Sequence, residues 1–276
     1  ALSESSQMLE RFPNSVVLHN ISGASNAALK RFDAAIDSYK QALRIKPDYA
    51  EVHNNMGSVM KDKGDLEQAI ESYQQALRIK PDYAVAHNNM AKAMKDKGDL
   101  NEAIDSFKQA LRIKPDYAAA YNNLGIALKD KGDLNEAIDS FKQAIRIKPD
   151  YAAAYYNMGV TLKDKGDLNE AINCYKQTIR IRPDYADAYN NLGNVFKGKG
   201  DLNEAIDYYK QAIRIRPDYA AAYYNMGNSL SDKGNLNEAI DCYKQAILIK
   251  PDYVNVHNNM GAALQLLNQN ELAQAS

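Results

Sequence analysis

The stretch KDKGDLNEAIDSFKQAIRIKPDYAAAYYNMG, residues 129–159, recurs with small changes along most of the chain. The eight prolines mark its period, because neighbouring prolines are always 34 residues apart: Pro13, Pro47, Pro81, Pro115, Pro149, Pro183, Pro217 and Pro251. A fixed period of about 20–50 residues is typical of proteins that stack one structural unit many times. We therefore expect a repeat architecture.

Each repeat can be numbered so that its proline is the thirty-second residue, and position numbers below refer to this frame. Seven full repeats result, at residues 16–49, 50–83, 84–117, 118–151, 152–185, 186–219 and 220–253. Residues 1–15 are a partial repeat, expected to form a second helix only. Residues 254–276 are another, expected to form a first helix and the start of a second.

Each repeat is expected to form two helices joined by a glycine turn. In the repeat at residues 152–185, the preceding Asp150 is placed to cap the first helix and Gly166 to end it. Asp167 with Glu170 resembles a capping box for the second helix, and Pro183 stops it. Small residues at positions 8 and 20 are expected to let the helices approach closely.

One set of residues within the repeat identifies a family: Tyr121, Leu124, Gly125, Ala137, Phe141, Ala144 and Pro149. This pattern resembles the tetratricopeptide repeat over essentially the whole chain. The resemblance implies an all-α, right-handed superhelical solenoid of helix-turn-helix repeats, with the first helices lining a concave groove. The sequence departs from the family in having Tyr or His where Trp is usual, and Ser22 and Lys30 depart in the first full repeat.

Composition excludes several classes of partner. The formal net charge is -1, from 34 basic and 35 acidic residues, which favours neither a nucleic acid nor an anionic membrane as partner. No apolar run approaches the ~20 residues of a membrane helix, and the first residues lack the features of a signal peptide. We expect a soluble, cytoplasmic protein.

No residue pattern predicts catalysis or a cofactor. The histidines His19, His53, His87 and His257 all occupy position 4, where tyrosine stands in other repeats, so we interpret them as packing residues. Cys174 and Cys242 lie two repeats apart, too far for a disulfide. Nothing resembles a phosphate loop, a nucleophile elbow or a metal-ligand cluster. We predict a non-enzyme without metal or cofactor.

Asparagines are the residues that repeat without an evident packing reason. Position 6 is asparagine in seven consecutive repeats: Asn55, Asn89, Asn123, Asn157, Asn191, Asn225 and Asn259. Asparagine is a poor helix former, yet its carboxamide can both donate to and accept from a peptide backbone. The O-linked N-acetylglucosamine transferases, which this region resembles, grip peptides with such a ladder. Two interpretations stay open: a peptide-binding row, or hydrogen bonds within the scaffold.

Other candidates for the groove flank this row. They are Asn122 and Asn190 at position 5, the tyrosines Tyr156 and Tyr224 that replace asparagine there, Lys129 and Lys163 from the position-12 lysine row, and Asn194 and Asn228 at position 9. An aspartate follows most of these lysines, which also fits a charge-balanced face without a partner. The basic residues of the family's carboxylate clamp are absent.

Three functions are compatible with these residues. The first is a scaffold that binds a protein or an extended peptide in the concave groove. The second is the substrate-recruiting arm of a larger glycosyltransferase or sulfotransferase. The third is an assembly module that forms homo-oligomers through its ends, because Ala27, Ala28, Leu29, Leu266 and Leu267 replace polar residues there.

Overall fold

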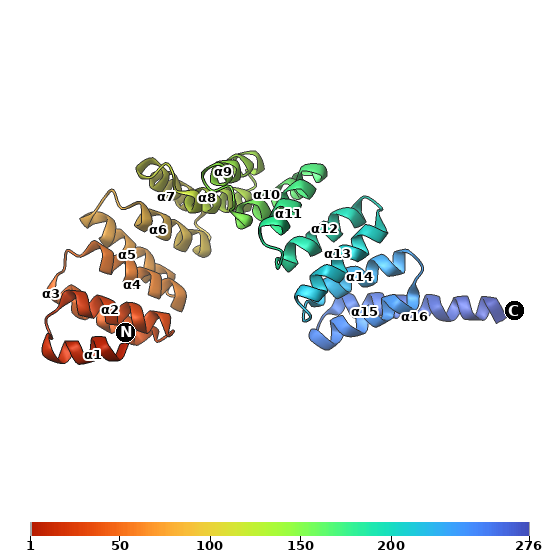
Figure 1. Ribbon diagram of the computed structural model, residues 1–276, viewed down its shortest axis with the longest axis horizontal. Helices are drawn as coiled ribbons and strands as arrows, with labels where there is room; N and C mark the ends of the chain where they lie inside the picture. The colour runs from red at the N-terminus through yellow and green to blue at the C-terminus, as the bar shows by residue number, and fades with distance from the viewer. Residues whose placement is uncertain (1, 276) are drawn as a thin grey trace. The chain divides into compact units, whose positions relative to one another are not determined.

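The computed structural model describes residues 2–275, and the side chains of residues 7–269. These residues form α-helices and turns, and the described part of the chain contains no strand. The helices divide into two compact units, which are described separately below. The first unit runs to Lys148 and contains α1 (Leu2–Arg11), α2 (Val16–Ala28), α3 (Phe32–Ile45), α4 (Ala50–Lys63), α5 (Leu66–Ile79), α6 (Ala84–Lys97), α7 (Leu100–Ile113), α8 (Ala118–Lys131) and α9 (Leu134–Ile147) (Figure 1).

The second unit begins at Pro149 and is built in the same way (Figure 1). It contains α10 (Ala152–Lys165), α11 (Leu168–Ile181), α12 (Ala186–Gly198), α13 (Leu202–Ile215), α14 (Ala220–Asp232), α15 (Leu236–Ile249) and α16 (Val254–Ala275). Within each unit, the first helix of a repeat packs on its own second helix and on the first helix of the next repeat. The expected all-α solenoid of helix-turn-helix repeats is confirmed.

Glycine at position 15 ends the first helix, as the sequence predicts. Gly166 follows α10 with φ 97°, in the left-handed region that glycine adopts without steric cost. The amide of Asp167 then donates to the carbonyl of Leu162 at 2.8 Å, and that of Gly166 to Lys163 at 3.0 Å. These bonds satisfy carbonyls that the end of the helix leaves free.

Small residues at position 8 allow the two helices of a repeat to touch. A Cβ atom added at Gly159 would lie 2.8 Å from Cε1 of Tyr175, which is closer than real Cβ contacts. Tyr175 is one of the position-24 aromatic side chains that fill the core and are almost inaccessible to solvent: Tyr39, Tyr73, Phe107, Phe141, Tyr175, Tyr209 and Tyr243. The glycine and the aromatic ring therefore fit together in every full repeat except residues 84–117, where Ala91 stands at position 8.

The expected aspartate caps are wrong. Tyr151, rather than Asp150, occupies the N-cap position of α10, and its side chain makes no capping bond. Asp167 does stand at the N-cap position of α11, but its side chain makes no capping bond either. The turn leads Asp167 back over the end of α10, where its carboxylate lies 3.0 Å from Nζ of Lys165. Ser15 does cap α2, accepting from the amide of Leu18 at 3.4 Å.

Two positions that lack the turn glycine behave differently. Lys30 takes the left-handed conformation itself, with φ 57°, and is the single non-glycine residue in the described part of the chain to do so. In the last repeat, Asn268 stands at the glycine position and no turn forms. α16 runs on as one helix from Val254 to Ala275, so the second helix expected there does not begin.

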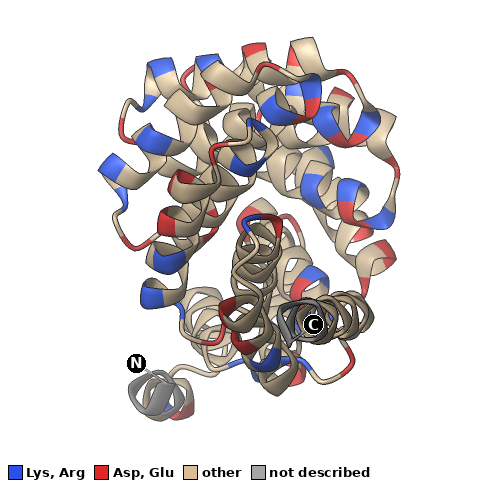
Figure 2. Ribbon diagram, turned by 90° about the vertical axis from the view of Figure 1, so that its right-hand side faces the viewer, with Lys and Arg blue, Asp and Glu red and all other residues tan. Residues whose placement is uncertain are grey.

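Charges alternate along the described helices. Figure 2 shows basic and acidic positions next to one another on the ribbons, with no extended region of one sign. A search of the described residues for helices with the length and apolarity of a membrane span identified none.

Candidate functional site

The position-6 asparagines form hydrogen bonds between successive first helices. In the first unit, the Nδ2 atoms of Asn55, Asn89 and Asn123 donate to Oδ1 of Asn20, Asn54 and Asn88 at 3.2, 3.1 and 3.1 Å. Each acceptor is at position 5 of the preceding repeat. In each unit, we call the surface that carries the position-6 side chains the asparagine face.

The second unit repeats this arrangement with two different acceptors. Asn225 donates to Asn190 at 3.0 Å, whereas Asn191 and Asn259 donate to the hydroxyl oxygens of Tyr156 and Tyr224 at 3.1 and 3.2 Å. A tyrosine at position 5 therefore replaces the asparagine as acceptor and keeps the bond between repeats. The bonds within the scaffold that the sequence left open are present.

The asparagines at position 5 and those at position 6 differ in their exposure to solvent. The position-5 asparagines Asn54, Asn88, Asn122 and Asn190 are only 4–6% exposed, so Asn122 and Asn190 lie between helices rather than on an open surface. Their placement differs from the expectation for groove residues, because the stacking of repeats covers position 5. The position-6 asparagines, Asn157 included, are half-buried and reach the surface.

The asparagine face retains unused hydrogen-bonding capacity. An asparagine carboxamide offers two N–H donors and an acceptor oxygen. Asn191 and Asn225 each use one donor in the bond between repeats, so their carboxamide oxygens take no part in that bond. Both side chains therefore offer an oxygen that is already oriented by the scaffold.

The tyrosines Tyr156 and Tyr224 add aromatic surface to the second unit. The ring of Tyr156 stacks on Tyr185, with centroids 4.9 Å apart, and that of Tyr224 lies 5.2 Å from Tyr253. Burial, followed by the nearby charge of Asp187, raises the pKa of Tyr156 above its ordinary value. Its hydroxyl therefore stays protonated near neutral pH and can still donate one hydrogen bond.

The remaining predicted residues have partners within the fold. Lys129 and Lys163 pair with the neighbouring Asp130 and Asp164 at 3.5 and 3.6 Å, which matches the charge-balanced face that the sequence left open. Asn194 and Asn228 accept from the buried hydroxyls of Tyr209 and Tyr243, both at 2.9 Å. These last bonds fix the asparagine amides by their oxygens and leave the NH₂ groups for other partners.

A polar cluster around Asp187 was not among the predicted site residues. Arg216 donates to Asp187 from Nη1 and Nη2 at 3.2 and 2.9 Å, and the Tyr219 hydroxyl donates at 2.7 Å. Asp187 and Arg216, together with Arg182 and Tyr185, line a cavity of about 250 Å³. The signal in the sequence is the coincidence of an acidic residue at position 2 with arginine, rather than lysine, at position 31 of the same repeat.

The histidines have a structural partner. Nε2 of His53 donates to the carbonyl of Pro47 at 3.0 Å, and the other three histidines make the same bond to the proline six residues earlier. In the described residues, no group of three His, Cys, Asp or Glu side chains is close enough to hold a metal. Cys174 and Cys242 are buried free thiols, and burial raises the pKa of Cys242 to about 11.

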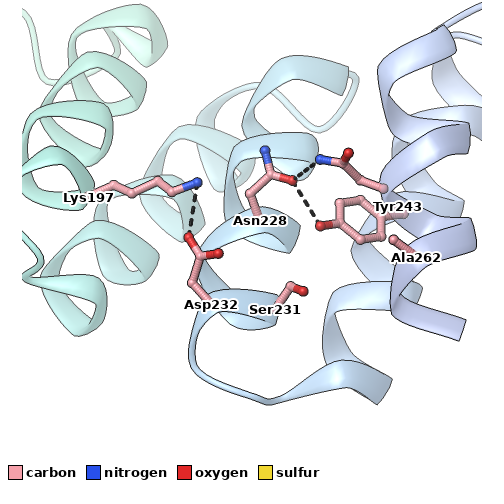
Figure 3. A pocket seen from close by; sticks show the side chains of 7 residues that line it. Lys197, Asn228, Ser231, Asp232, Tyr243 and Ala262 are labelled. Carbon is pink, nitrogen blue, oxygen red and sulfur yellow. Dashed lines mark hydrogen bonds and ion pairs between the residues drawn. The ribbon is translucent and has the colours of Figure 1, made fainter. Parts of the chain in front are cut away.

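A second cavity of about 220 Å³ lies in the second unit, between α12, α14, α15 and α16 (Figure 3). Its lining includes Lys197, Asn228, Ser231, Asp232 and Tyr243. Nζ of Lys197 lies 3.2 Å from Oδ2 of Asp232. Asn228 accepts from both Tyr243 and Asn259, the latter at 2.8 Å, so its carboxamide is held from two sides.

Comparison with known proteins gives one matching family model, that of the Cilia and flagella-associated protein 70 C-terminal domain, over residues 20–248. The crystal structure of MamA is 33% identical, covers 60% of this chain and 96% of its own, and has a TM-score of 0.56. YrrB, described as a TPR protein with an unusual peptide-binding site, is 24% identical over 67% of this chain and 95% of its own, with a TM-score of 0.54.

A chain from the APC/C hetero-tetramer Cut9-Hcn1 covers 95% of this chain and 52% of its own, with a TM-score of 0.70. It is 17% identical, so that likeness concerns the fold alone. Comparison with curated proteins gave no significant match.

Proposed function

Since the chain belongs to the family of the Cilia and flagella-associated protein 70 C-terminal domain and is built of tetratricopeptide repeats, we propose that it is a non-catalytic scaffold for protein interactions. We assign the binding of an extended peptide segment of the partner to the asparagine face. The observation that carries this proposal is the set of half-buried position-6 carboxamides whose oxygens, at Asn191 and Asn225, take no part in the bonds between repeats.

An extended peptide offers backbone N–H and C=O groups at regular intervals, whatever its side chains are. The carboxamide oxygens of Asn191 and Asn225 can accept from the peptide N–H groups, and the second Nδ2 hydrogen can donate to its carbonyls. Each such bond contributes only about 0.5–1.5 kcal/mol, so several repeats must act together. Because the scaffold bond orients each carboxamide before a peptide arrives, less rotamer entropy is lost on binding.

The test uses an array of unrelated decapeptides, probed with the native chain and with the double variant Asn191→Ala/Asn225→Ala. Asn135→Ala/Asn237→Ala is the matched control, because these asparagines are exposed on second helices, away from the asparagine face. We expect the native chain and the control to retain the same peptides and the asparagine-face variant to lose them. Equal binding by all three proteins, each with native helicity, would refute the proposal.

Two alternatives remain predictions. Self-association would use the apolar residues at the ends, of which Leu29 and Leu266 are 54% and 49% exposed, and sedimentation velocity over a range of concentrations tests it. The role of a recruiting arm within a larger transferase requires a catalytic domain in the same gene. The similarity to the O-linked N-acetylglucosamine transferases is likewise still a prediction.

A further inference from the structure

The lysine and aspartate at positions 12 and 13 form a regular pair in four successive repeats. Lys61, Lys95, Lys129 and Lys163 lie 3.1–3.6 Å from the aspartate that follows each of them. The sixth and seventh full repeats each lack one member, because Gly198 replaces the aspartate and Ser231 replaces the lysine. Lys197 and Asp232 are left without a neighbour in their own repeats and pair with each other instead, at 3.2 Å.

Asp96 shows that an aspartate at position 13 can hold two ammonium groups. Its Oδ1 atom lies 3.1 Å from Nζ of Lys95 in the same repeat. Its Oδ2 atom lies 3.9 Å from Nζ of Lys61 in the preceding repeat. The two oxygens of one carboxylate thus serve two cations, which approach from neighbouring repeats.

Asp232 has only half of this arrangement. Its Oδ2 atom contacts Lys197 of the preceding repeat, but Ser231 leaves Oδ1 without the ammonium that the same repeat supplies to Asp96. In Figure 3, the second carboxylate oxygen of Asp232 lies on the side of Ser231 and the cavity, away from Lys197. Ser231, which stands where the earlier repeats carry that lysine, lines the 220 Å³ cavity.

The opposite wall of this cavity is rigid. Tyr243 and Asn259 both donate to Oδ1 of Asn228, so the orientation of the Asn228 carboxamide is fixed. The Tyr243 side chain is 1% exposed, and burial, followed by the nearby charges, raises its pKa to about 12, so it remains a donor at neutral pH. A group that enters the cavity therefore meets a preformed polar site, which lowers the cost of binding.

We propose that this cavity, named here the Ser231 pocket, binds a basic side chain, lysine or arginine, of the peptide held on the asparagine face. The incoming cation contacts Oδ1 of Asp232 and takes the place of the ammonium that position 12 supplies in earlier repeats. This inference rests on the proposed function, and it adds a side-chain preference to a face that otherwise recognises peptide backbone. Binding of an acidic side chain is disfavoured, because the ammonium group of Lys197 is already paired with Asp232.

The first test does not require that the asparagine face bind a peptide backbone. Nα-acetyl-lysine N-methylamide is titrated into the isotope-labelled native chain at low salt, and NMR follows the amides of Ser231, Asp232 and the Asn228 side chain. The uncharged analogue Nα-acetyl-norleucine N-methylamide is the matched ligand. We expect shifts with the lysine derivative that are absent or much smaller with norleucine. Equal shifts with both ligands, or no shift at these residues, would overturn the proposal. Larger shifts with Nα-acetyl-glutamate N-methylamide, titrated in the same way, would also overturn it.

Two variants test whether the NMR response to the lysine derivative arises at the Ser231 pocket. Ser231→Lys restores the residue of the earlier repeats and should abolish the response, because its own ammonium fills the site. Asn237→Lys adds the same charge on the exposed surface of α15 and should preserve it. A response that persists in Ser231→Lys contradicts the assignment.

The second test separates this inference from the proposed function. Decapeptides of serine and alanine with one varied central residue are arrayed and probed with the native chain and with Ser231→Lys. Since the carboxylate of Asp232 is 52% exposed, we expect lysine or arginine to improve retention about two- to fivefold, and Ser231→Lys to remove that preference. Binding that depends on Asn191 and Asn225 but shows no basic preference refutes the pocket alone. Absence of all peptide binding refutes the proposed function, and the NMR titration then still decides on the pocket.

Discussion

Arg216 forms two hydrogen bonds with Asp187, one from each terminal nitrogen, and thereby ties the start of α12 to the segment that leads into α14. Tyr219 donates a third bond to the same carboxylate. Three other full repeats carry alanine at position 2, namely Ala119, Ala153 and Ala221, so this connection belongs to one place in the chain. These hydrogen bonds stabilise the packing of α12 at one place in a chain of otherwise similar repeats.

Replacing Asp187 by alanine should lower the free energy of unfolding by about 1 kcal/mol, because three hydrogen bonds are lost but both charged groups are partly open to water. Urea denaturation measures the change. Glu51→Ala removes an acidic residue from the same position of another repeat, where it is exposed, and should have little effect. Equal losses in the two variants would mean that the bonds to Arg216 contribute nothing.

The stabilisation by Asp187 should depend on pH. Burial alone would raise the pKa of its carboxyl group, but the hydrogen bonds from Arg216 and Tyr219 and the charge of Arg216 outweigh burial and lower the pKa. A lowered pKa in the folded state means that the contribution is fully present above the unfolded value of about 3.9 and is lost as the pH falls through the folded value. The difference in unfolding free energy between the native chain and Asp187→Ala should therefore shrink from pH 6 to pH 3. A constant difference across that range contradicts this account.

Alanine substitutions at two glycines of α12 should change the stability of the protein in opposite directions. A Cβ at Gly193 would lie 2.5 Å from Cε1 of the buried Tyr209, so Gly193→Ala should cost about 1–3 kcal/mol through overpacking. A Cβ at Gly198 would meet nothing within 4 Å, and Gly198→Ala should stabilise the helix by about 0.5–1 kcal/mol. Thermal unfolding of the two variants checks both signs. If Gly193→Ala is as stable as the native chain, the helices are not held at the distance that the structure shows.

The repeat period, the pairing of helices and the glycine turns could be predicted because each depends on residues within one repeat. The bond from Asn225 to Asn190 could not, since its two residues are 35 positions apart and meet only when one first helix stacks on the next. For the same reason, the sequence showed asparagine at both positions 5 and 6 but not that the stack covers position 5 and leaves position 6 at the surface. The caps were wrongly predicted because aspartate before a helix is a local signal, whereas the turn brings Asp167 beside Lys165.

The first full repeat provides the last prediction. Lys30 adopts φ 57° where six later repeats have glycine at the same position of the turn. A side chain in this left-handed conformation costs roughly 1–2 kcal/mol, because Cβ approaches the following carbonyl oxygen. Lys30→Gly should therefore increase the free energy of unfolding of the first unit by up to about 1 kcal/mol, after subtraction of the entropy that glycine loses on folding. Hydrogen exchange of the amides of α2 and α3 measures this locally. Gly64→Ala makes the reverse change in the next repeat and should reduce the protection of amides in α4 and α5. Faster exchange in Lys30→Gly than in the native chain would show that the turn at Lys30 is not strained.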